Sequence, residues 1–212
     1  MPQYRLQPLE GYRAFPGPVV CVIMDGVGIG NRDESDGVFL AHTPVLDRLF
    51  LDTMFTQLKA HGAAVGMPSD SDMGNSEVGH NTLGAGRVFE QGASLVNRAI
   101  ESGALFEGET WRTLTTQAAN GGTIHFIGLL SDGNVHSHIR HLLAMLDRCA
   151  NEGAKRVRLH VLADGRDVGE RSILGYLDQL NEKLAELNTA GRDYRVASGG
   201  GRMNVTMDRY QA

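Results

Sequence analysis

The sequence predicts an α/β protein whose strands form a parallel β-sheet. Residues 19–24 are a continuous run of mainly β-branched apolar residues, typical of a strand buried on both faces of such a sheet. From about residue 110, strand-like and helix-like segments alternate at the spacing of parallel strands joined by right-handed crossovers. Glycine occurs 27 times, mostly between these segments, where tight turns favour it. A chain of 212 residues suffices for one large domain or two small ones.

The first part of the chain is expected to alternate between short strands and helices. The strand at 19–24 ends at Asp25, and ligands of open α/β sheets bind beyond the carboxyl ends of strands. Thr43 and Pro44 have the pattern of a helix cap followed by a proline at the first helical position. The other expected elements are a short strand at 55–58, a helix beginning near Ser76, and an amphipathic helix containing Leu95, Val96 and Ile100.

The second part of the chain has the clearest alternation. The predicted helices are 110–120, 138–151 and 170–187, and the predicted strands are 122–130, 156–162 and 194–197. A parallel sheet needs helices on both faces. Because no further helix follows the last predicted strand before Ala212, we expect this chain to be a fragment of a longer protein.

Composition excludes several classes of protein. The content of 42% hydrophobic and 21% charged residues is that of a globular protein. A net charge of −5 without a long basic run argues against a nucleic-acid partner, and no run approaches the roughly 20 apolar residues of a membrane helix. Cys21 and Cys149 lack the spacing of a zinc site or a disulfide framework, so a reducing cytoplasm is the expected compartment.

Residues 71–80 form the segment with the most chemical information. Two glycines, an amide, carboxylates and Ser76 stand in a turn that is expected to open a helix. The unsatisfied N–H groups at a helix start stabilise anions, so a phosphoryl group on Ser76 would be stabilised there. The alternative is that Ser76 only caps the helix, because serine is a favoured capping residue.

Three polar loops follow the three predicted strands of the second part. They contain residues 131–138, 164–167 and 201–209, and loops at the same end of a parallel sheet converge on one cleft. An imidazole, carboxylates and guanidinium groups in that cleft would suit a small polyanionic substrate, because arginine binds carboxylate and phosphate bidentately. The alternative is that each Asp-Gly pair is an ordinary turn and each arginine pairs with a neighbouring aspartate.

Two other interpretations have weaker support. His136, His138 and His141 could bind a metal, but His138 falls at a predicted helix start and the nearby arginines would repel a cation, which makes His136 a better candidate for a substrate contact. The glycines at 26, 28 and 30 resemble a dinucleotide-binding loop, but Asn31 stands where the third glycine of that pattern is needed.

Five motifs in the same order resemble a known family. They are VIMDG at 22–26, MGNSEVGH at 73–80, GLLSDGNVHSH at 128–138, ADGRD at 163–167, and Gly201-Arg202 with Met207-Asp208-Arg209. Together they resemble the cofactor-independent phosphoglycerate mutases of the alkaline phosphatase superfamily. The resemblance implies an α/β fold with part of an alkaline-phosphatase-like parallel sheet in residues 1–86 and an α/β transferase domain, incomplete at its carboxyl end, in residues 87–212.

The resemblance also implies a reaction and roles for individual residues. The reaction is the interconversion of 3-phosphoglycerate and 2-phosphoglycerate through a phosphoserine at Ser76, a step of glycolysis and gluconeogenesis. Asp25 and Ser76 would bind metal, and Asp167 would move the proton between the two glycerate hydroxyls. The implied substrate-binding residues are His136, Arg166, Asp167, Arg202 and Arg209.

The resemblance further implies cofactors and partners. Two divalent ions are expected, Mn²⁺ first and Mg²⁺ or Co²⁺ as alternatives, without 2,3-bisphosphoglycerate. Phosphoglycerate is the expected partner, with no nucleic acid or membrane, and the full-length protein is expected to be a monomer. Because family members are more than twice as long, the chain alone is expected to be inactive. A metal-dependent phosphatase of the same superfamily and a non-catalytic phosphoglycerate-binding module remain alternatives.

Overall fold

The computed structural model describes residues 10–13, 16–189 and 191–206. Contacts within the chain divide it into two compact units, Met1–Thr56 and Gln57–Ala212. The predicted domains, 1–86 and 87–212, stay a prediction. The predicted substrate residue Arg209 lies outside the described residues.

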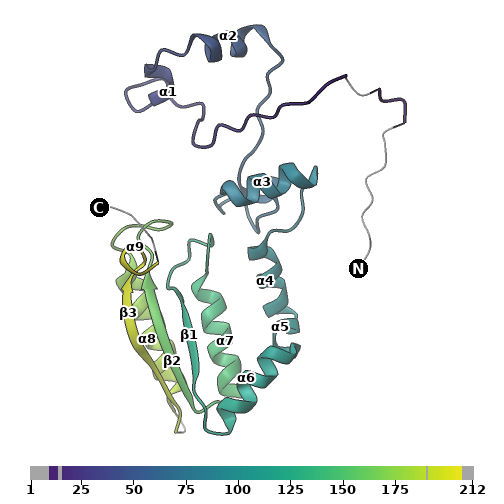
Figure 1. Cartoon of the computed structure of the whole chain (residues 1–212). Helices are drawn as coiled ribbons and strands as arrows, with labels where there is room; N and C mark the ends of the chain where they lie inside the picture. Colours follow the sequence, from purple (N-terminus) through teal and green to yellow (C-terminus); the bar gives the residue numbers. More distant parts are fainter. Residues whose placement is uncertain (1–9, 14–15, 190, 207–212) are drawn as a thin grey trace. The chain divides into compact units, whose positions relative to one another are not determined.

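The first unit contains two short helices and no strand in its described residues. Helix α1 spans Gly37–Leu40, and helix α2 spans Pro44–Asp52 (Figure 1). The predicted start of α2 is confirmed, because Pro44 is its first residue and Thr43 precedes it. The Thr43 hydroxyl donates to the Asp47 carboxylate at 3.0 Å instead of capping a backbone N–H.

The prediction of a strand at residues 19–24 is wrong. These residues have no strand hydrogen bonds, and Val19 and Val20 are 88% and 78% exposed. The strand predicted at 55–58 is also not formed. A strand is stable only when its N–H and C=O groups bond to a neighbouring strand, and neither segment has such a partner among the described residues. Asp25 therefore follows an extended, exposed segment instead of a sheet.

The second unit contains a three-stranded parallel sheet in the order β1-β2-β3. Strand β1 spans Ile124–Leu129, β2 spans Arg156–Ala163 and β3 spans Asp193–Gly201 (Figure 1). Ile124 pairs with Val157, which pairs with Tyr194 on its other side. The α/β class and the alternation predicted for the second part are thus confirmed.

The helices before and between the strands lie close to the predicted positions. Helix α6 spans Glu109–Ala119, α7 spans Ile139–Asn151 and α8 spans Ile173–Leu187. Before them, the amphipathic helix predicted around Leu95 is α4, Gly92–Glu101, which is followed by the single turn α5, Ala104–Glu107. The spacing of apolar residues was therefore sufficient to place these helices.

Strand β3 is longer than the predicted 194–197, because the three consecutive glycines belong to it. A Cβ atom on Gly200 would lie 2.9 Å from Cγ2 of Val205. Val205 ends helix α9, the single turn Arg202–Val205 that follows the strand directly. The glycines allow this turn to fold back against the strand, and so they place Arg202 immediately at the end of the sheet.

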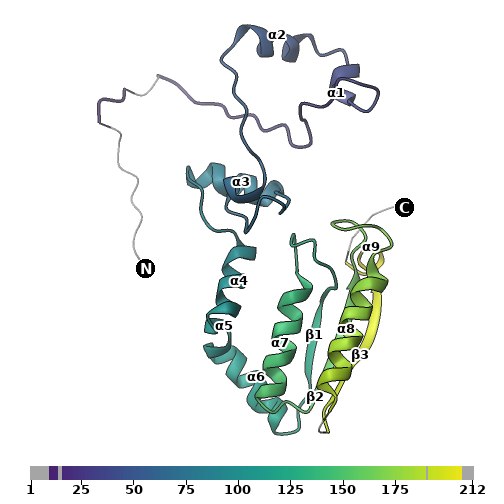
Figure 2. The ribbon, with the colours of Figure 1, turned by 180° about the vertical axis from the view of Figure 1, so that it is seen from behind.

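The core lies between the sheet and the helices on one of its faces. Views from opposite sides show α7 and α8 on the same face (Figures 1 and 2). The buried residues of this core include Leu146, Leu159, Leu180, Leu184 and Tyr194. The Tyr194 hydroxyl donates to the Ala154 carbonyl at 2.9 Å, and burial raises the pKa of Tyr194 to about 12. In contrast, the strand residue Ile127 is 73% exposed.

Helix α3, Ser76–Ala85, packs in a smaller cluster before α4. Val78 of α3 is buried with Val65 and Met67, which lie in and after the 3₁₀ helix η1, Gly62–Val65. The Gln91 side chain donates to the Val65 carbonyl at 3.0 Å. This cluster gives the loop before Ser76 its own small core.

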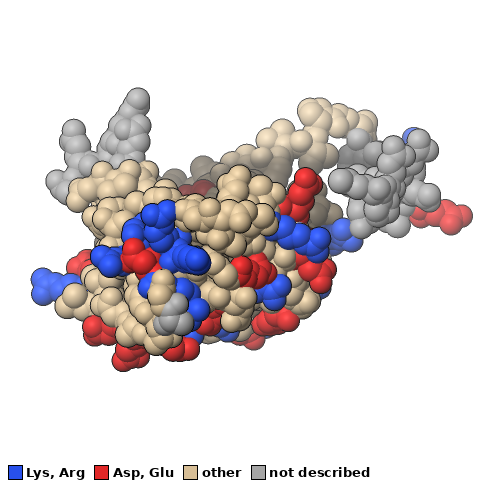
Figure 3. Space-filling view, turned by 90° about the horizontal axis from the view of Figure 1, so that it is seen from below, with Lys and Arg blue, Asp and Glu red and all other residues tan. Residues whose placement is uncertain are grey.

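Charged side chains of both signs lie close together on the surface. Figure 3 shows one end of the molecule, where Lys and Arg lie among Asp and Glu. Asp193 illustrates this mixing, because it forms ion pairs with both Arg158 and Arg195. No helix within the described ranges is long and apolar enough to cross a membrane.

Candidate anion-binding site at the carboxyl ends of the strands

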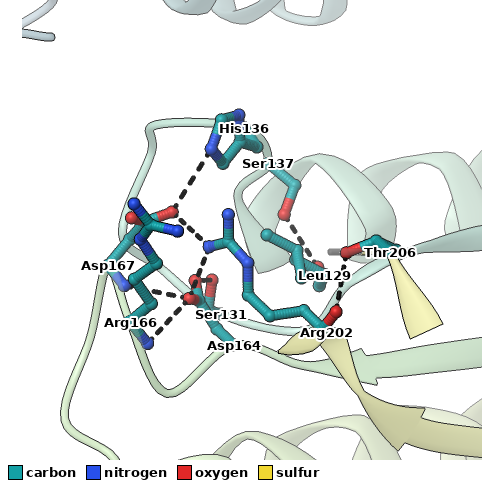
Figure 4. A network of polar contacts seen from close by, with 9 residues as sticks. All are labelled: Leu129, Ser131, His136, Ser137, Asp164, Arg166, Asp167, Arg202 and Thr206. Atoms are coloured by element: carbon teal, nitrogen blue, oxygen red, sulfur yellow. Dashed lines mark hydrogen bonds and ion pairs between the residues drawn. The ribbon is translucent and has the colours of Figure 1, made fainter. Parts of the chain in front are cut away.

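As predicted, the three polar loops of the second part, the third as far as residue 206, meet at one end of the sheet (Figure 4). Each loop begins where a strand ends: Ser131 soon after β1, Asp164 directly after β2 and Arg202 directly after β3. Parallel strands end at the same edge, so these side chains are brought together although they lie up to 71 residues apart in the chain. The sheet thus builds the site.

Asp164 lies at the centre of the site and is 5% exposed. One of its oxygens accepts the Ser131 hydroxyl at 2.6 Å. The other accepts the Arg202 guanidinium at 2.9 Å and the backbone N–H groups of Asp167 and Arg166 at 2.9 and 3.2 Å. Burial opposes ionisation of Asp164, but these hydrogen bonds outweigh it and lower the pKa of Asp164 to about 2. Asp164 is therefore a carboxylate at neutral pH.

Arg202 is a buried cation held between two carboxylates. It is 6% exposed, and its Nη1 atom donates to Asp164 at 2.9 Å and to Asp167 at 2.6 Å. Burial disfavours the charge of Arg202, but the two carboxylates raise its pKa. Its Nε atom is buried and has no hydrogen-bond partner in the described part of the chain. Since an orphaned buried donor is costly, this N–H group is a candidate for a ligand contact.

Asp167 connects the buried part of the site to the surface. One carboxylate oxygen accepts from Arg202 and lies 3.6 Å from Nε2 of His136, whose side chain is 57% exposed. Figure 4 shows the Arg166 side chain next to Asp167. The site can therefore offer an anion an imidazole and guanidinium groups, with a carboxylate among them that can take up or give a proton.

Four of the five predicted substrate residues lie together, namely His136, Arg166, Asp167 and Arg202 (Figure 4). Sequence reasoning assigned no role to Asp164 and Ser131, although both stand in the quoted loops. A signal for them existed, because each is among the first polar residues after a predicted strand. The alternative that each arginine pairs with an aspartate is correct for Arg202, and this pairing fixes its position within the site.

Ser76 is the first residue of α3, and Asn75 is the cap. The Asn75 side chain accepts the Val78 N–H at 3.0 Å, so the interpretation of Ser76 as the helix cap is wrong. The Ser76 hydroxyl lies 3.2 Å from Nδ1 of His80, one turn later. Ser76 itself is exposed.

The preceding Gly74 is required by close packing. A Cβ atom at Gly74 would lie 2.0 Å from the Ala60 carbonyl oxygen. Only glycine fits such an approach, so this residue of the MGNS segment fixes the path of the backbone leading to Ser76.

The described residues do not form a complete metal centre. Asp25 belongs to the first unit and Ser76 to the second. Within the described ranges, no group of three or more His, Cys, Asp or Glu residues is placed to hold a metal ion. Nδ1 of His138 accepts the Arg140 N–H at 3.1 Å and caps α7, so this nitrogen is already engaged.

Fold and site define an α/β protein with a cluster of charged side chains at the carboxyl ends of parallel strands. Residues 96–212 match the family model of the BPG-independent PGAM N-terminus. The chain belongs to the 2,3-bisphosphoglycerate-independent phosphoglycerate mutase family, and it corresponds to the amino-terminal portion of its members.

Individual relatives agree with this membership. The chain is 55% identical over 207 residues to the 2,3-bisphosphoglycerate-independent phosphoglycerate mutase of Trypanosoma brucei brucei. This match covers 96% of this chain and 38% of that protein. It is 49% identical over 195 residues to the Zea mays enzyme of the same name, covering 91% and 35%. A Leishmania mexicana phosphoglycerate mutase, crystallised at low cobalt concentration, matches with a TM-score of 0.81 and 52% identity, covering 90% of this chain and 35% of that one. The chain thus spans little more than a third of these relatives.

Proposed function

We propose that this chain is the amino-terminal part of an enzyme that interconverts 3-phosphoglycerate and 2-phosphoglycerate through a phosphoserine. The observation that carries the proposal is the cluster of Arg202, Asp167 and His136 around the buried carboxylate of Asp164. It combines groups that hold a phosphate and a carboxylate with a group that can transfer a proton. Family membership supports the same reaction, because the relatives bear that name.

Ser76 is the proposed carrier of the phosphoryl group. Ser76 is the first residue of a ten-residue helix, and this supports the proposal because a phosphoryl group there would be stabilised by backbone N–H groups and by the positive end of the helix dipole. Two divalent ions, Mn²⁺ first, are part of the proposal, with Asp25 and Ser76 as the ligands that this chain would contribute. Bound ions of this kind favour the serine alkoxide and screen the charge of the phosphate.

Asp167 is the proposed acid-base residue. In the transfer step, a glycerate hydroxyl loses its proton to Asp167 and its oxygen forms a bond to phosphorus. The bond between phosphorus and Oγ of Ser76 breaks, and Oγ leaves with the electron pair as the alkoxide, so the single proton released by the glycerate remains on Asp167. Arg202 donates to one carboxylate oxygen of Asp167, and Nε2 of His136 lies 3.6 Å from the same oxygen, so both side chains help to fix the position of this carboxylate. Arg166 and Arg209 are the proposed further contacts to the substrate.

The test uses a chimera that joins residues 1–212 to the carboxyl-terminal remainder of the Trypanosoma brucei relative. Purified with Mn²⁺, the chimera is expected to convert 3-phosphoglycerate into 2-phosphoglycerate, and Ser76→Ala is expected to abolish the conversion. Ser71→Ala is the matched control, because it removes an exposed hydroxyl of the same loop whose hydrogen bond is to Ser69. Conversion that survives Ser76→Ala would refute the phosphoserine.

The 212-residue chain alone provides a second test. We expect no mutase activity from it, because its described residues lack a complete metal centre. Detectable conversion by the purified chain would contradict this expectation. Calorimetry with 3-phosphoglycerate, with and without Mn²⁺, tests the binding-module alternative, which metal-independent binding would favour. Phosphate release by the chimera without isomer formation would favour the phosphatase alternative.

The remaining parts of the proposal concern the whole protein. The alkaline-phosphatase-like sheet that the resemblance implies would be completed by segments that the relatives have beyond the region matched here. The cytoplasm is the proposed compartment, since both cysteines are free thiols. A monomer remains the proposed oligomeric state of the full-length protein.

A further inference from the structure

A hydrogen bond joins the loop before Ser76 to the loop after β1. The side-chain amide of Asn134 donates to Oδ1 of Asp72 at 2.5 Å, across 62 residues of sequence. The other oxygen of Asp72 accepts the backbone N–H and the hydroxyl of Ser69 at 2.8 and 2.6 Å. Partial burial opposes ionisation of Asp72, but the hydrogen bonds from Asn134 and Ser69 lower its pKa, so a carboxylate accepts this bond at neutral pH.

On the side of the strands, Asn134 is rigidly held within the anion-binding site. It is 8% exposed and adopts a left-handed backbone with φ of 56°, and its N–H donates to the Ser137 carbonyl at 3.2 Å. Its neighbour Gly133 packs directly against Asp167, because a Cβ atom there would lie 3.1 Å from Cβ of Asp167. His136 follows two residues later. A displacement of Asn134 would therefore move the residues that are proposed to hold the glycerate.

On the side of the serine, the loop around Asp72 is equally constrained. The Asp72 carbonyl accepts the Gly62 N–H at 3.1 Å, and Gly74 fits closely against the Ala60 carbonyl. Asn75 then caps α3, which begins at Ser76. Only three residues separate Asp72 from Ser76, and their path is fixed at both ends. The position of the Ser76 hydroxyl therefore follows that of Asp72.

We propose that Asp72 and Asn134 are positioning residues that hold the phosphoserine within reach of the bound glycerate. This inference rests on the proposed function. After phosphorylation of Ser76, the phosphoryl group has two acceptors: a glycerate hydroxyl, which gives the isomer, or water, which gives inorganic phosphate. Either acceptor forms a bond to phosphorus, while the bond from phosphorus to Oγ of Ser76 breaks and Oγ leaves with its electron pair as the alkoxide. The glycerate hydroxyl gives its proton to Asp167, and water gives its proton to the solvent. A fixed distance between the serine and the glycerate site favours the glycerate hydroxyl, since a misplacement of about 1 Å can cost a factor of 100 in rate.

The test exchanges donor and acceptor in the chimera described above. Asn134→Asp places a second carboxylate opposite Asp72, where the two charges repel each other, and aspartate tolerates the left-handed backbone. The double variant Asp72→Asn with Asn134→Asp restores a hydrogen bond with the opposite direction. Asn181→Asp, an exposed change of the same type on α8, is the matched control.

The measured quantity is the ratio of 2-phosphoglycerate formed to inorganic phosphate released. We expect Asn134→Asp to lower this ratio about tenfold or more, the double variant to return it to within about threefold of the parent, and the control to leave it unchanged. A ratio that stays constant while both products fall together would overturn the inference and assign the pair to folding only. Failure of the exchange to restore the ratio would overturn it as well.

The inference and the proposed function fail in different ways. If Ser76→Ala leaves isomerisation intact, the proposed phosphoserine intermediate is wrong, and the product ratio no longer tests the positioning role of Asp72 and Asn134. If Ser76→Ala abolishes isomerisation but the ratio is insensitive to Asn134→Asp, the reaction stands and the positioning role is wrong.

Discussion

Replacing Asp164 by asparagine should reveal how much the buried ion cluster contributes to folding. The pKa of Asp164 falls from 3.8 to about 2 in the folded chain. At about 1.4 kcal/mol per pKa unit, ionised Asp164 contributes about 2 kcal/mol to the free energy of unfolding at neutral pH. Because the folded pKa is the lower one, this contribution is present above pH 4 and is lost as the pH falls through 2. Linkage predicts a loss of about 1 kcal/mol between pH 5 and pH 3.

The variant Asp164→Asn should lack this pH dependence. At pH 7 we expect its free energy of unfolding to be about 2–4 kcal/mol lower than that of the parent chain, because the buried Arg202 loses one of its two carboxylates. The difference between parent and variant should shrink by about 1 kcal/mol when the pH falls from 5 to 3.

Urea titration of the 212-residue chain measures both effects. Unfolding is monitored by the fluorescence of the single tryptophan, Trp111, which is buried in the main core. Asp178→Asn, at an exposed position of α8, is the matched control and should leave the curve unchanged. If the free energies of unfolding of the parent and of Asp164→Asn fall by the same amount as the pH is lowered, Asp164 is not the ionised centre of the cluster.

Three further outcomes follow from packing. Cys21 is exposed and should react with a thiol reagent in the native chain. Burial raises the pKa of Cys149 to about 12, so Cys149 should react only after unfolding. If mass spectrometry detects labelling of both cysteines in the native chain, this prediction is wrong. Leu146→Ala, at a fully buried position of α7, should lower the free energy of unfolding by about 2–5 kcal/mol in the same urea assay, and a loss below about 1 kcal/mol would mean a looser core. Gly74→Ala should displace the loop before Ser76 and abolish isomerisation by the chimera, whereas Gly79→Ala, with open space around its Cβ, should be tolerated; equal activity of the two would exclude the close packing.

The helices and strands between residues 109 and 201 were predictable because each carries its own periodicity of apolar residues. The strand predicted at 19–24 was not formed, although its composition is that of a buried strand. Apolar β-branched residues indicate that a segment suits a sheet, but hydrogen bonding needs a neighbouring strand, and the residues of the segment itself cannot supply one.

The sequence predicted which residue types make up the candidate site, but not which of them form hydrogen bonds with one another. His136, Arg166, Asp167 and Arg202 stand in recognisable motifs after strands, and the sheet brings them together. The central role of Asp164 depends on the distances between three loops, which the register of the sheet sets and no local pattern encodes. The alternative that Ser76 caps α3 could not be decided from the sequence for a related reason. Serine and asparagine are both good caps, and only the backbone geometry selects Asn75.

The exposed segment at 19–24 has a consequence for handling the protein in solution. Its six residues, VVCVIM, carry no charge and no proline, and in the described part of the chain they form no strand hydrogen bonds. Such a segment is a template to which another molecule can add a strand, and repetition of that step leads to fibrils. We therefore expect this segment to promote self-association of the purified chain, and the substitution Val22→Lys to raise its solubility.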